Sequence, residues 1–568
     1  MNPKNPAFDY SKYRPFEFAP KLENRTWCDK VIEKAPIWAS VDLRDGNQAL
    51  IDPMNIEQKL VFFKLLVDVG FKEIEIGFPS ASQVEFDFTR RLIDEGLVPD
   101  DVTLQVLVQA REHLIERTFE SLQGAKRAIV HVYNSTSKVQ REKVYKMSKD
   151  EIKAIAVAGA TMLKDKAKNY PDTEWVFQYS PESFSQTETE YAVEVCDAVC
   201  DVWQPWTGQQ VILNLPATVE ASTPNIYADQ VEYFCRHLKH RKDVIISLHT
   251  HNDRGCAVAA SELGLMAGAD RIEGTLFGNG ERTGNMDIVT MAMNLYTQGI
   301  DPKLDFSQMS EIGRVVSECN QLPIHPRHPY IGELVFTAFS GSHQDAIKKS
   351  LDFNEAHPET EKHWDVAYLP IDPKHIGRGY QDVVRINSQS GKGGAAYILQ
   401  RHHGFNLPRW AQIDFARLVQ KEAESQAREL KTEELLAIFT QTYLNQDVYA
   451  LKDYSINNKS GVVTFTGSVD KVNDSFEIVG TGNGALSAFI DGMNQYTGKE
   501  IHITNYAEHA IASGENPAPA DDNKTNSQAA AYIQLSVDGK VYLGVGVCNS
   551  TVSAMLKGAL SALAQAKL

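Results

Sequence analysis

The sequence predicts an α/β fold whose first half is a closed (β/α)8 barrel, or TIM barrel. From residue 37 to about residue 294, short runs rich in β-branched residues alternate with longer amphipathic stretches, and eight such pairs can be counted. Strands that alternate with helices form parallel sheets, and eight repeats in a segment of this length fit a closed barrel better than an open, doubly wound sheet. An open sheet with the same strand count remains the alternative.

Each predicted strand is followed by a stretch with helical periodicity. In residues 56–69, for example, Leu60, Phe63, Leu66 and Val67 fall on one helix face. The predicted strands are Ile37–Leu43, Lys72–Phe78, Val102–Val108, Arg127–Asn134, Glu174–Pro181, Gln210–Ala217, Val244–His251 and Arg271–Gly278.

Composition restricts the partners of the chain. Its 57 Lys and Arg against 74 Asp and Glu give a formal net charge of −17, which repels nucleic-acid phosphates and anionic lipid surfaces alike. We therefore expect neither a nucleic acid nor a membrane partner. The N-terminus does not resemble a signal peptide, and no segment has the roughly 18 apolar residues of a membrane span. The seven scattered cysteines lack paired zinc-binding spacing, which favours reduced thiols and a cytoplasmic location.

At 568 residues the chain is too long for one hydrophobic core, so we expect several domains. Four parts are predicted: an N-terminal extension (1–36), the barrel (37–303), a helical linker subdomain (304–431) and a C-terminal α+β domain (432–568). The linker has a charged helix near Gln412–Leu430. The last domain has two strand-strand-helix units, which indicate an internal duplication. Its predicted elements are strands at 461–469, 475–480, 500–506, 529–537 and 540–547, helices at 485–496 and 551–566, and a loop at 513–528.

Polar residues at the ends of the first and seventh strands predict a metal site, since catalysis in such barrels occurs where strands end. His249 and His251 are two residues apart, so both imidazoles point to one side of the strand. Asp45 follows the first strand and lies beside them once the barrel closes. Two histidines and one carboxylate leave coordination positions open, and Asn285 could add an oxygen or hold a ligated water. These ligand types do not choose between Zn²⁺, Mn²⁺ and Mg²⁺, and two satisfied polar histidines remain the alternative.

Eight motifs are spread over nearly the whole chain, and they are VDLRDGNQ (41–48), SPES (180–183), NLPAT (214–218), HTHNDRG (249–255), GNGERTGN (278–285), FSGSHQD (339–345), YLPIDP (368–373) and SQSGKGG (388–394). Together they resemble the motifs of the α-isopropylmalate synthase family, in its longer subtype typified by actinobacterial enzymes. Thr250 departs from the pattern, because proline is expected there; its side chain lies on the face opposite the two histidines, so metal binding should survive.

The resemblance implies a Claisen-type condensation of acetyl-CoA with 2-oxoisovalerate and water, which gives α-isopropylmalate and CoA. This reaction is the committed step of leucine biosynthesis. The keto acid can chelate the metal, which would act as a Lewis acid. Arg44 suits stabilisation of the enolate and of the new alkoxide, with a salt bridge to a barrel carboxylate as the alternative. The family pattern implies His343 as the base, supported by Glu182 and Tyr368. His343 and Tyr368 would reach the partner's barrel, which implies a homodimer; a surface histidine is the alternative.

The resemblance also implies a keto-acid pocket and an effector site. Thr218 resembles the residue that holds the keto acid's carboxylate. One methylene group changes the free energy that separates two competing substrates by only about 1–3 kcal/mol. The sequence therefore identifies the reaction more firmly than the keto acid. The pocket wall would comprise Leu107, His131, Tyr133, Ser180 and Asn214.

Two segments near the C-terminus, 482–488 and 506–510, resemble the leucine-binding domain of these synthases. Glycines before a helix let a carboxylate approach the free N–H groups of its first turn. Leucine is therefore expected as a feedback inhibitor, with the domain's own core as the alternative role. The implied effector residues are Gly484, Leu486, Ser487, Ile503, Tyr506 and Ala510.

Three other functions agree with part of the sequence. A homocitrate or citramalate synthase would share the metal site, the arginine and the base but hold another keto acid. Hydroxymethylglutaryl-CoA lyase belongs to the same barrel group, but the long C-terminal domain argues against it. A catalytically silent amino-acid-binding regulator conflicts with the intact set of site residues. The glycine-rich run Ser390–Gly394 lacks phosphate-loop spacing and is interpreted as a tight turn, with contact to CoA as a minor alternative.

Overall fold

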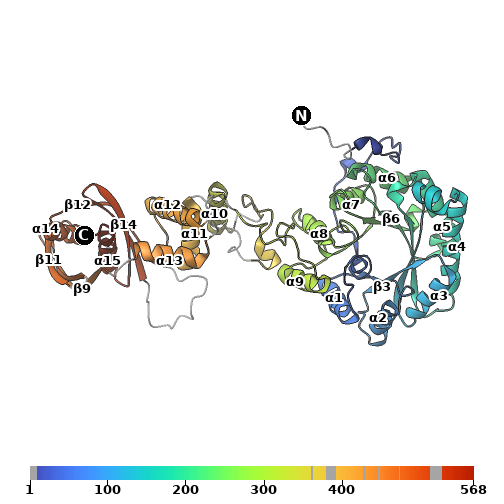
Figure 1. Ribbon diagram of the computed structural model, residues 1–568, viewed down its shortest axis with the longest axis horizontal. Helices are drawn as coiled ribbons and strands as arrows, with labels where there is room; N and C mark the ends of the chain where they lie inside the picture. Colours follow the sequence, from blue (N-terminus) through green and yellow to red (C-terminus); the bar gives the residue numbers. More distant parts are fainter. Residues whose placement is uncertain are drawn as a thin grey trace. The chain divides into compact units, whose positions relative to one another are not determined.

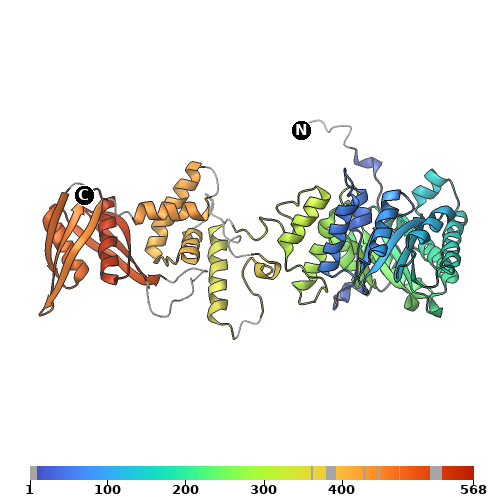
Figure 2. The same ribbon diagram turned by 90° about the horizontal axis from the view of Figure 1, so that it is seen from below.

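The computed structural model describes residues 9–338, 340–359, 363–378, 392–426, 430–444, 448–471, 474–511 and 528–568. The chain divides into two compact units (Figures 1 and 2). The first unit contains residues 1–335 and 374–378, and the second contains residues 336–373 and 379–568. Among the described residues, no helix combines the length and the apolar character needed to cross a bilayer.

The first unit is built around a closed parallel barrel, which confirms the predicted fold class and rules out the open sheet. The strands follow one another in chain order, and β8 pairs with β1, for example Arg271 with Ile37. β1 and β8 end earlier than predicted because tight helical turns follow them. The strands are β1 (Ile37–Ser40), β2 (Glu73–Gly77), β3 (Thr103–Gln109), β4 (Arg127–Ser135), β5 (Glu174–Glu182), β6 (Val211–Ala217), β7 (Ile245–Thr250) and β8 (Arg271–Gly274).

Helices surround this barrel, as Figure 1 shows. The first of them starts with a capping box between Asn55 and Gln58 and buries Phe62, Phe63 and Leu66. They are α1 (Ile56–Val69), α2 (Gln83–Asp94), α3 (Glu112–Ser121), α4 (Lys149–Ala167), α5 (Thr189–Trp203), α6 (Pro224–His237), α7 (Ala257–Met266), α8 (Ile288–Tyr296) and α9 (Met309–Asn320). Short 3-10 or π turns are η1 (Tyr10–Lys12), η2 (Trp27–Asp29), η3 (Asp42–Gly46), η4 (Gln140–Tyr145), η5 (Phe184–Gln186), η6 (Pro205–Thr207), η7 (Arg241–Asp243), η8 (Leu276–Gly278) and η9 (Pro373–Ile376).

The interior of the barrel is layered. At the N-terminal ends of the strands, Ile129, Val176 and Ile212 form an apolar plug, with Ile245 packed against it. One layer higher the side chains are buried but polar or charged. This layer supports the pocket at the C-terminal ends of the strands, and it contains Glu75, Gln105, Gln178, Arg271 and Glu273.

The segment before the barrel is fastened to α6. Arg25 donates to both carboxylate oxygens of Asp229, at 2.6 and 2.7 Å, and the Trp27 indole donates to the same side chain at 2.9 Å. The backbone N–H of Thr26 donates to Glu232 at 3.0 Å. Because Asp229 and Glu232 are buried, this segment completes the helix layer.

The second unit begins with helices, as the predicted linker subdomain requires. The predicted helix near 412–430 corresponds to α12, which starts and ends a few residues earlier. Of the glycine-rich run, residues 390 and 391 lie outside the described residues, and Lys392 begins a helix rather than lying in a turn. The helices are α10 (Gly341–Ala356), α11 (Lys392–His403), α12 (Arg409–Gln426) and α13 (Thr432–Tyr443).

The rest of this unit contains two three-stranded antiparallel sheets, each followed by a helix. The predicted strand-strand-helix unit is therefore corrected to three strands and a helix. The missed strand, β9, is exposed along most of its length, so no alternation of apolar residues marks it. Most of the predicted loop at 513–528 lies outside the described residues. The two repeats are β9 (Tyr449–Lys459), β10 (Val462–Lys471), β11 (Asp474–Gly482) and α14 (Ala485–Thr497), then β12 (Ile501–Ile511), β13 (Gln528–Val537), β14 (Lys540–Cys548) and α15 (Thr551–Gln565).

The two repeats also pack their helices in the same way. A Cβ atom added to Gly480 on β11 would lie 2.2 Å from the carbonyl oxygen of Ala488 on α14. One added to Gly544 on β14 would lie 2.1 Å from that of Gly558 on α15. In both repeats the last strand thus needs a glycine where the helix crosses it, which supports the predicted duplication.

Candidate active site

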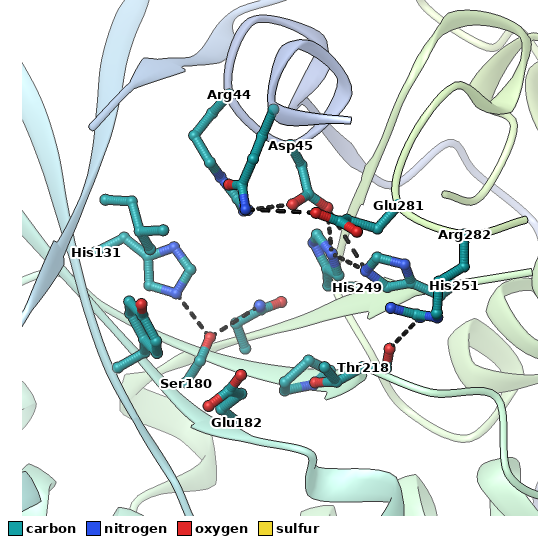
Figure 3. A pocket seen from close by; sticks show the side chains of 15 residues that line it. Arg44, Asp45, His131, Ser180, Glu182, Thr218, His249, His251, Glu281 and Arg282 are labelled. Carbon is teal, nitrogen blue, oxygen red and sulfur yellow. Dashed lines mark hydrogen bonds and ion pairs between the residues drawn. The ribbon is translucent and has the colours of Figure 1, made fainter. Parts of the chain in front are cut away.

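A pocket of about 270 Å³ lies at the C-terminal ends of the barrel strands (Figure 3). It brings together every predicted site residue of the barrel except Asn285, which lies directly behind it and donates to Asp45. Some other residues that line the pocket were not among the predicted site residues, although all of them lie within the motifs at 41–48, 214–218 and 278–285. The missed residues are Gln48, Pro216, Glu281 and Arg282.

Three possible metal ligands converge in this pocket, and all three are buried. The Nε2 atoms of His249 and His251 lie 3.1 Å apart, and they lie 3.2 and 3.5 Å from Oδ2 of Asp45. Atoms about 2.1 Å from one ion at tetrahedral angles lie about 3.4 Å apart, so this spacing fits a divalent cation. The π turn η3 brings Asp45 to this position immediately after β1.

Unsatisfied polar atoms next to the triad also fit a bound cation or its water. The side-chain oxygen of Asn285 is buried and has no hydrogen-bond partner among the described residues, while its nitrogen donates to Asp45 at 2.8 Å. Nδ1 of His251 is likewise buried without a partner in the described part of the chain. Buried polar atoms are rarely left unpaired, so these two point to a missing ligand or solvent. Asp45, His249, His251 and Asn285 are therefore the residues that could hold a metal.

The ionisation of the triad favours a positive charge in its centre. Burial works against protonation of His249, but the carboxylates of Asp45 and Glu273 outweigh it and raise its pKa to about 9. Burial and the neighbouring His249 lower the pKa of His251 to about 3. Arg44 and both histidines, against the effect of burial, lower the pKa of Asp45 far below its usual value. One positive charge is therefore held between two imidazoles and a carboxylate.

Arg44 is a permanently charged group at the edge of the same pocket. Its guanidinium contacts the carboxylates of Asp45 and Glu75, so the salt bridge considered as its alternative role is present. Burial lowers the pKa of Arg44, but the two carboxylates more than offset this and raise it above its usual value. The residue lines the pocket and remains cationic there.

Across the pocket from Arg44, the side chains of the wall are linked by a series of hydrogen bonds. Nδ1 of His131 lies 3.3 Å from Glu75, which as a carboxylate can only accept, so Nδ1 carries the proton. Nε2 of His131 then accepts the hydroxyl hydrogen of Ser180 at 2.7 Å, and Ser180 in turn accepts from Asn214 at 3.0 Å. Leu107 and Tyr133 complete this wall.

Thr218 and Glu182 lie near the ends of β6 and β5. The Thr218 hydroxyl oxygen accepts from the backbone N–H of Ser183 at 2.9 Å, so its hydrogen remains available to a ligand. Burial raises the pKa of Glu182 above its usual value. A carboxyl group in this state can exchange a proton nearer to neutral pH than a surface carboxyl can.

His343 and Tyr368 belong to the second unit. Their rings stack with centroids 4.0 Å apart, and both side chains are exposed, Tyr368 to 61 %. The pair therefore presents an imidazole and a phenol together at a surface of that unit.

The predicted effector residues lie in the first strand of the second repeat and at the start of α14. Gly484 caps that helix, and its N–H donates to the Ser487 hydroxyl at 2.9 Å. Ile503 and Tyr506 on β12 are 37 and 44 % exposed, and Ala510 is exposed as well. By contrast, Leu486 is buried in the core of the domain, which agrees with the alternative prediction that these residues form the domain's own core.

A closed (β/α)8 barrel with a triad of possible metal ligands at its mouth defines the class of this protein as a barrel enzyme. Three families match successive parts of the chain. The HMGL-like family matches residues 35–316, the α-isopropylmalate synthase post-catalytic domain-like family matches 333–400, and the LeuA allosteric (dimerisation) domain matches 429–567.

Curated relatives match the chain over nearly its whole length. The 2-isopropylmalate synthase of Clostridium acetobutylicum is 51 % identical and aligns with 98 % of this chain and 100 % of that protein. Those of Azotobacter vinelandii and Pseudomonas fluorescens are 53 and 54 % identical, over 98 and 97 % of this chain and 97 and 96 % of those proteins. The chain belongs to the 2-isopropylmalate synthase family and is an enzyme of the acyltransferase type. The resemblance inferred from its motifs is confirmed.

Proposed function

We propose that the chain condenses acetyl-CoA with 2-oxoisovalerate and water to give 2-isopropylmalate and CoA, the first committed step of leucine biosynthesis. The observation that carries this proposal is the convergence of Asp45, His249 and His251 beside Arg44 in one pocket. A divalent cation bound there would chelate the keto acid and polarise its carbonyl group. Zn²⁺, Mn²⁺ and Mg²⁺ all remain compatible with these ligands.

The residues around the triad would orient the keto acid and stabilise charge. The Thr218 hydroxyl has a hydrogen to donate to the carboxylate, and Arg44 supplies positive charge next to the reacting carbonyl. The wall of Leu107, Tyr133 and the hydrogen-bonded chain from His131 to Asn214 would enclose the isopropyl group.

Removal of a proton from the acetyl methyl group needs a base. We assign this role to His343, supported by Tyr368 and Glu182, with His343 and Tyr368 contributed by the partner of a homodimer. The stacking of His343 on Tyr368 supports a joint role. The match to a domain described as allosteric and for dimerisation supports a dimer.

The acetyl-CoA arm would reach the pocket through a second cavity of the same unit. This cavity has a volume of about 1070 Å³, and Arg44, Gln48, Leu107 and Tyr133 line both spaces. Met54, Phe78 and Val84 are among its apolar lining, which suits the pantetheine chain. A thioester at the shared boundary would lie beside Arg44.

The charges in the pocket favour 2-oxoisovalerate over a dicarboxylic keto acid. Among the described residues that line it, both arginines are already paired: Arg44 with Asp45 and Glu75, and Arg282 with Asp253 at 2.7 Å. The second carboxylate of 2-oxoglutarate would therefore be buried without a counter-ion, at considerable cost. This argues against a homocitrate synthase.

We further propose that leucine binds the C-terminal domain through Gly484, Ser487, Ile503, Tyr506 and Ala510 and inhibits the barrel. The domain divisions 1–36, 37–303, 304–431 and 432–568 are part of this proposal. The family matches that begin at 35 and 429 support the first and the last division, whereas the HMGL-like match runs to 316 and the first compact unit to 335, past the proposed end of the barrel at 303. A cytoplasmic location agrees with the seven cysteines, all of which are free.

Thiol release from acetyl-CoA tests the proposal directly. We expect release with 2-oxoisovalerate, much less with pyruvate and almost none with 2-oxoglutarate, and a chelator should abolish it. Asp45→Asn serves as the inactive control because it keeps the shape of the side chain. Faster release with pyruvate would instead indicate a citramalate synthase. Release that a chelator leaves unchanged would contradict the metal centre.

A further inference from the structure

Two buried carboxylates lie beneath the pocket, and each faces one of its histidines. Glu75 on β2 lies 3.3 Å from Nδ1 of His131, and Glu273 on β8 lies 2.8 Å from Nδ1 of His249. Gln105 on β3 joins them, because its amide donates to both. The layer thus connects the candidate metal ligand His249 to the wall of the keto-acid pocket.

Glu273 is held in place from several directions. Arg271 donates to its Oε1 at 2.7 Å, and Gln178 donates to the same atom at 2.7 Å. The other oxygen, Oε2, faces His249. Glu273 and Arg271 are both fully shielded from solvent. One carboxylate oxygen is therefore fixed by the barrel, and the other is left to the histidine.

This arrangement sets which ring nitrogen of His249 carries the proton. An ionised carboxylate only accepts hydrogen bonds, so Nδ1 must donate to Glu273. When a cation displaces the second proton of His249, as metal ligation requires, Nε2 is left with its lone pair directed at Asp45 and His251, where the cation would lie. His251 lacks such support, because its Nδ1 has no hydrogen-bond partner among the described residues. The two histidines are thus unequal, and His249 is the one oriented in advance.

We propose that Glu273 is a positioning residue for the metal centre: it fixes the tautomer and orientation of His249 and makes it the stronger donor. This inference rests on the metal site of the proposed function. Carboxylates that hold a ligating histidine in this way commonly change metal affinity about 10- to 100-fold when they are removed.

The competing explanation is that Glu273 only neutralises the buried Arg271. Glu73 separates the two explanations, since it accepts from Nε of Arg271 at 2.6 Å and makes no contact with the pocket. Glu73→Gln removes one counter-ion of Arg271 and leaves His249 untouched. It is therefore the matched control for Glu273→Gln.

The test measures the affinity of the full-length protein for Mn²⁺ and Zn²⁺ by competition with a chromophoric chelator, without substrates. We expect Glu273→Gln to weaken binding about 10- to 100-fold and Glu73→Gln to leave it within about twofold of the wild type. The visible spectrum of the Co²⁺-loaded protein should change in Glu273→Gln alone, since it reports the ligand field directly. Circular dichroism of the metal-free variants establishes that both are folded.

Equal metal affinity in Glu273→Gln and the wild type would overturn the proposal, as would equal weakening in both variants. Should Glu273→Gln fail to fold, Glu273→Asp keeps the charge near Arg271 and withdraws it from His249. Weakened binding in this variant supports the proposal, and wild-type binding overturns it. This metal-binding test contains no substrate and is therefore independent of the proposed reaction. A wild type that binds metal but releases no thiol when acetyl-CoA and 2-oxoisovalerate are supplied would contradict the proposed reaction and leave this inference standing.

Discussion

Nε2 of His249, a residue of β7, and Nε2 of His251, which directly follows the end of β7, lie 3.1 Å apart. The site holds one positive charge between the two rings and Asp45, and a divalent cation bound to both Nε2 atoms would take the place of the proton on His249. We expect a chelator to abolish turnover, and His251→Ala to weaken metal binding by about 100-fold or more. Thiol release with and without the chelator measures the first effect, and metal content after dialysis measures the second. His237→Ala, an exposed histidine on α6, is the control. Full metal occupancy in His251→Ala would contradict the site.

Glu182→Gln removes a buried ionisable carboxyl group. The variant enzyme should lose activity but gain thermal stability above neutral pH. The loss of an ionisable group that supports the base should lower kcat by about 100-fold or more. Burial raises the pKa of Glu182, so the folded protein binds its proton more tightly than the unfolded chain does. Its contribution to stability is thus full at acid pH and declines as pH rises through the raised pKa. The variant should therefore have a higher Tm than the wild type at pH 8 and a similar Tm at pH 4, by calorimetry. An equal difference at both values would refute this account.

Leu107→Ala tests the wall of the keto-acid pocket. Leu107 is nearly buried and lines the pocket from β3, so truncation opens space beside the isopropyl group. We expect kcat/KM for 2-oxoisovalerate to fall about 10- to 200-fold, while longer branched keto acids lose less. Steady-state kinetics with both substrates measures the ratio. Leu97→Ala, at an exposed leucine, should change neither value. A uniform loss for all keto acids would place Leu107 outside the specificity wall.

Tyr506→Ala tests the effector site. The Tyr506 residue is 44 % exposed and, within the described part of the chain, its hydroxyl bonds Glu508 of the same strand, so its removal should leave the fold and basal turnover intact. We expect leucine inhibition to weaken about 5- to 150-fold, the usual range of coupling between two sites. Inhibition curves at fixed substrate measure it. Val541→Ala on β14 is the exposed control. If leucine inhibits Tyr506→Ala as strongly as the wild type, its binding site lies elsewhere.

The barrel and its pocket could be predicted from the sequence because their signals are local and repeated. Eight apolar runs mark the strands, and polar residues at the strand ends mark the pocket. The layer of Glu75, Gln105 and Glu273 escaped prediction, since charges in the middle of a strand usually argue against burial. The alternation of Arg271 and Glu273, two residues apart on one strand, was the available signal for an inward-facing ion pair.

An exposed strand and a pair of residues far apart in the sequence were harder to predict. β9 lacks the alternation that a half-buried strand shows, because its first residue is buried and most of the others face solvent. His343 and Tyr368 are 25 positions apart and come together only through the fold of the second unit, which spacing in the sequence does not encode.

The two repeats of the C-terminal domain differ at the residue that opens each helix. α15 begins after Ser550, whose side chain accepts from the N–H of Ser553, whereas α14 begins after Gly484, which has no side chain to do so. Two repeats with the same order of three strands and a helix would offer a small carboxylate two similar positions, one at the start of each helix. Here one of them is already occupied by the chain's own hydroxyl group, so we expect a stoichiometry of one effector molecule per polypeptide.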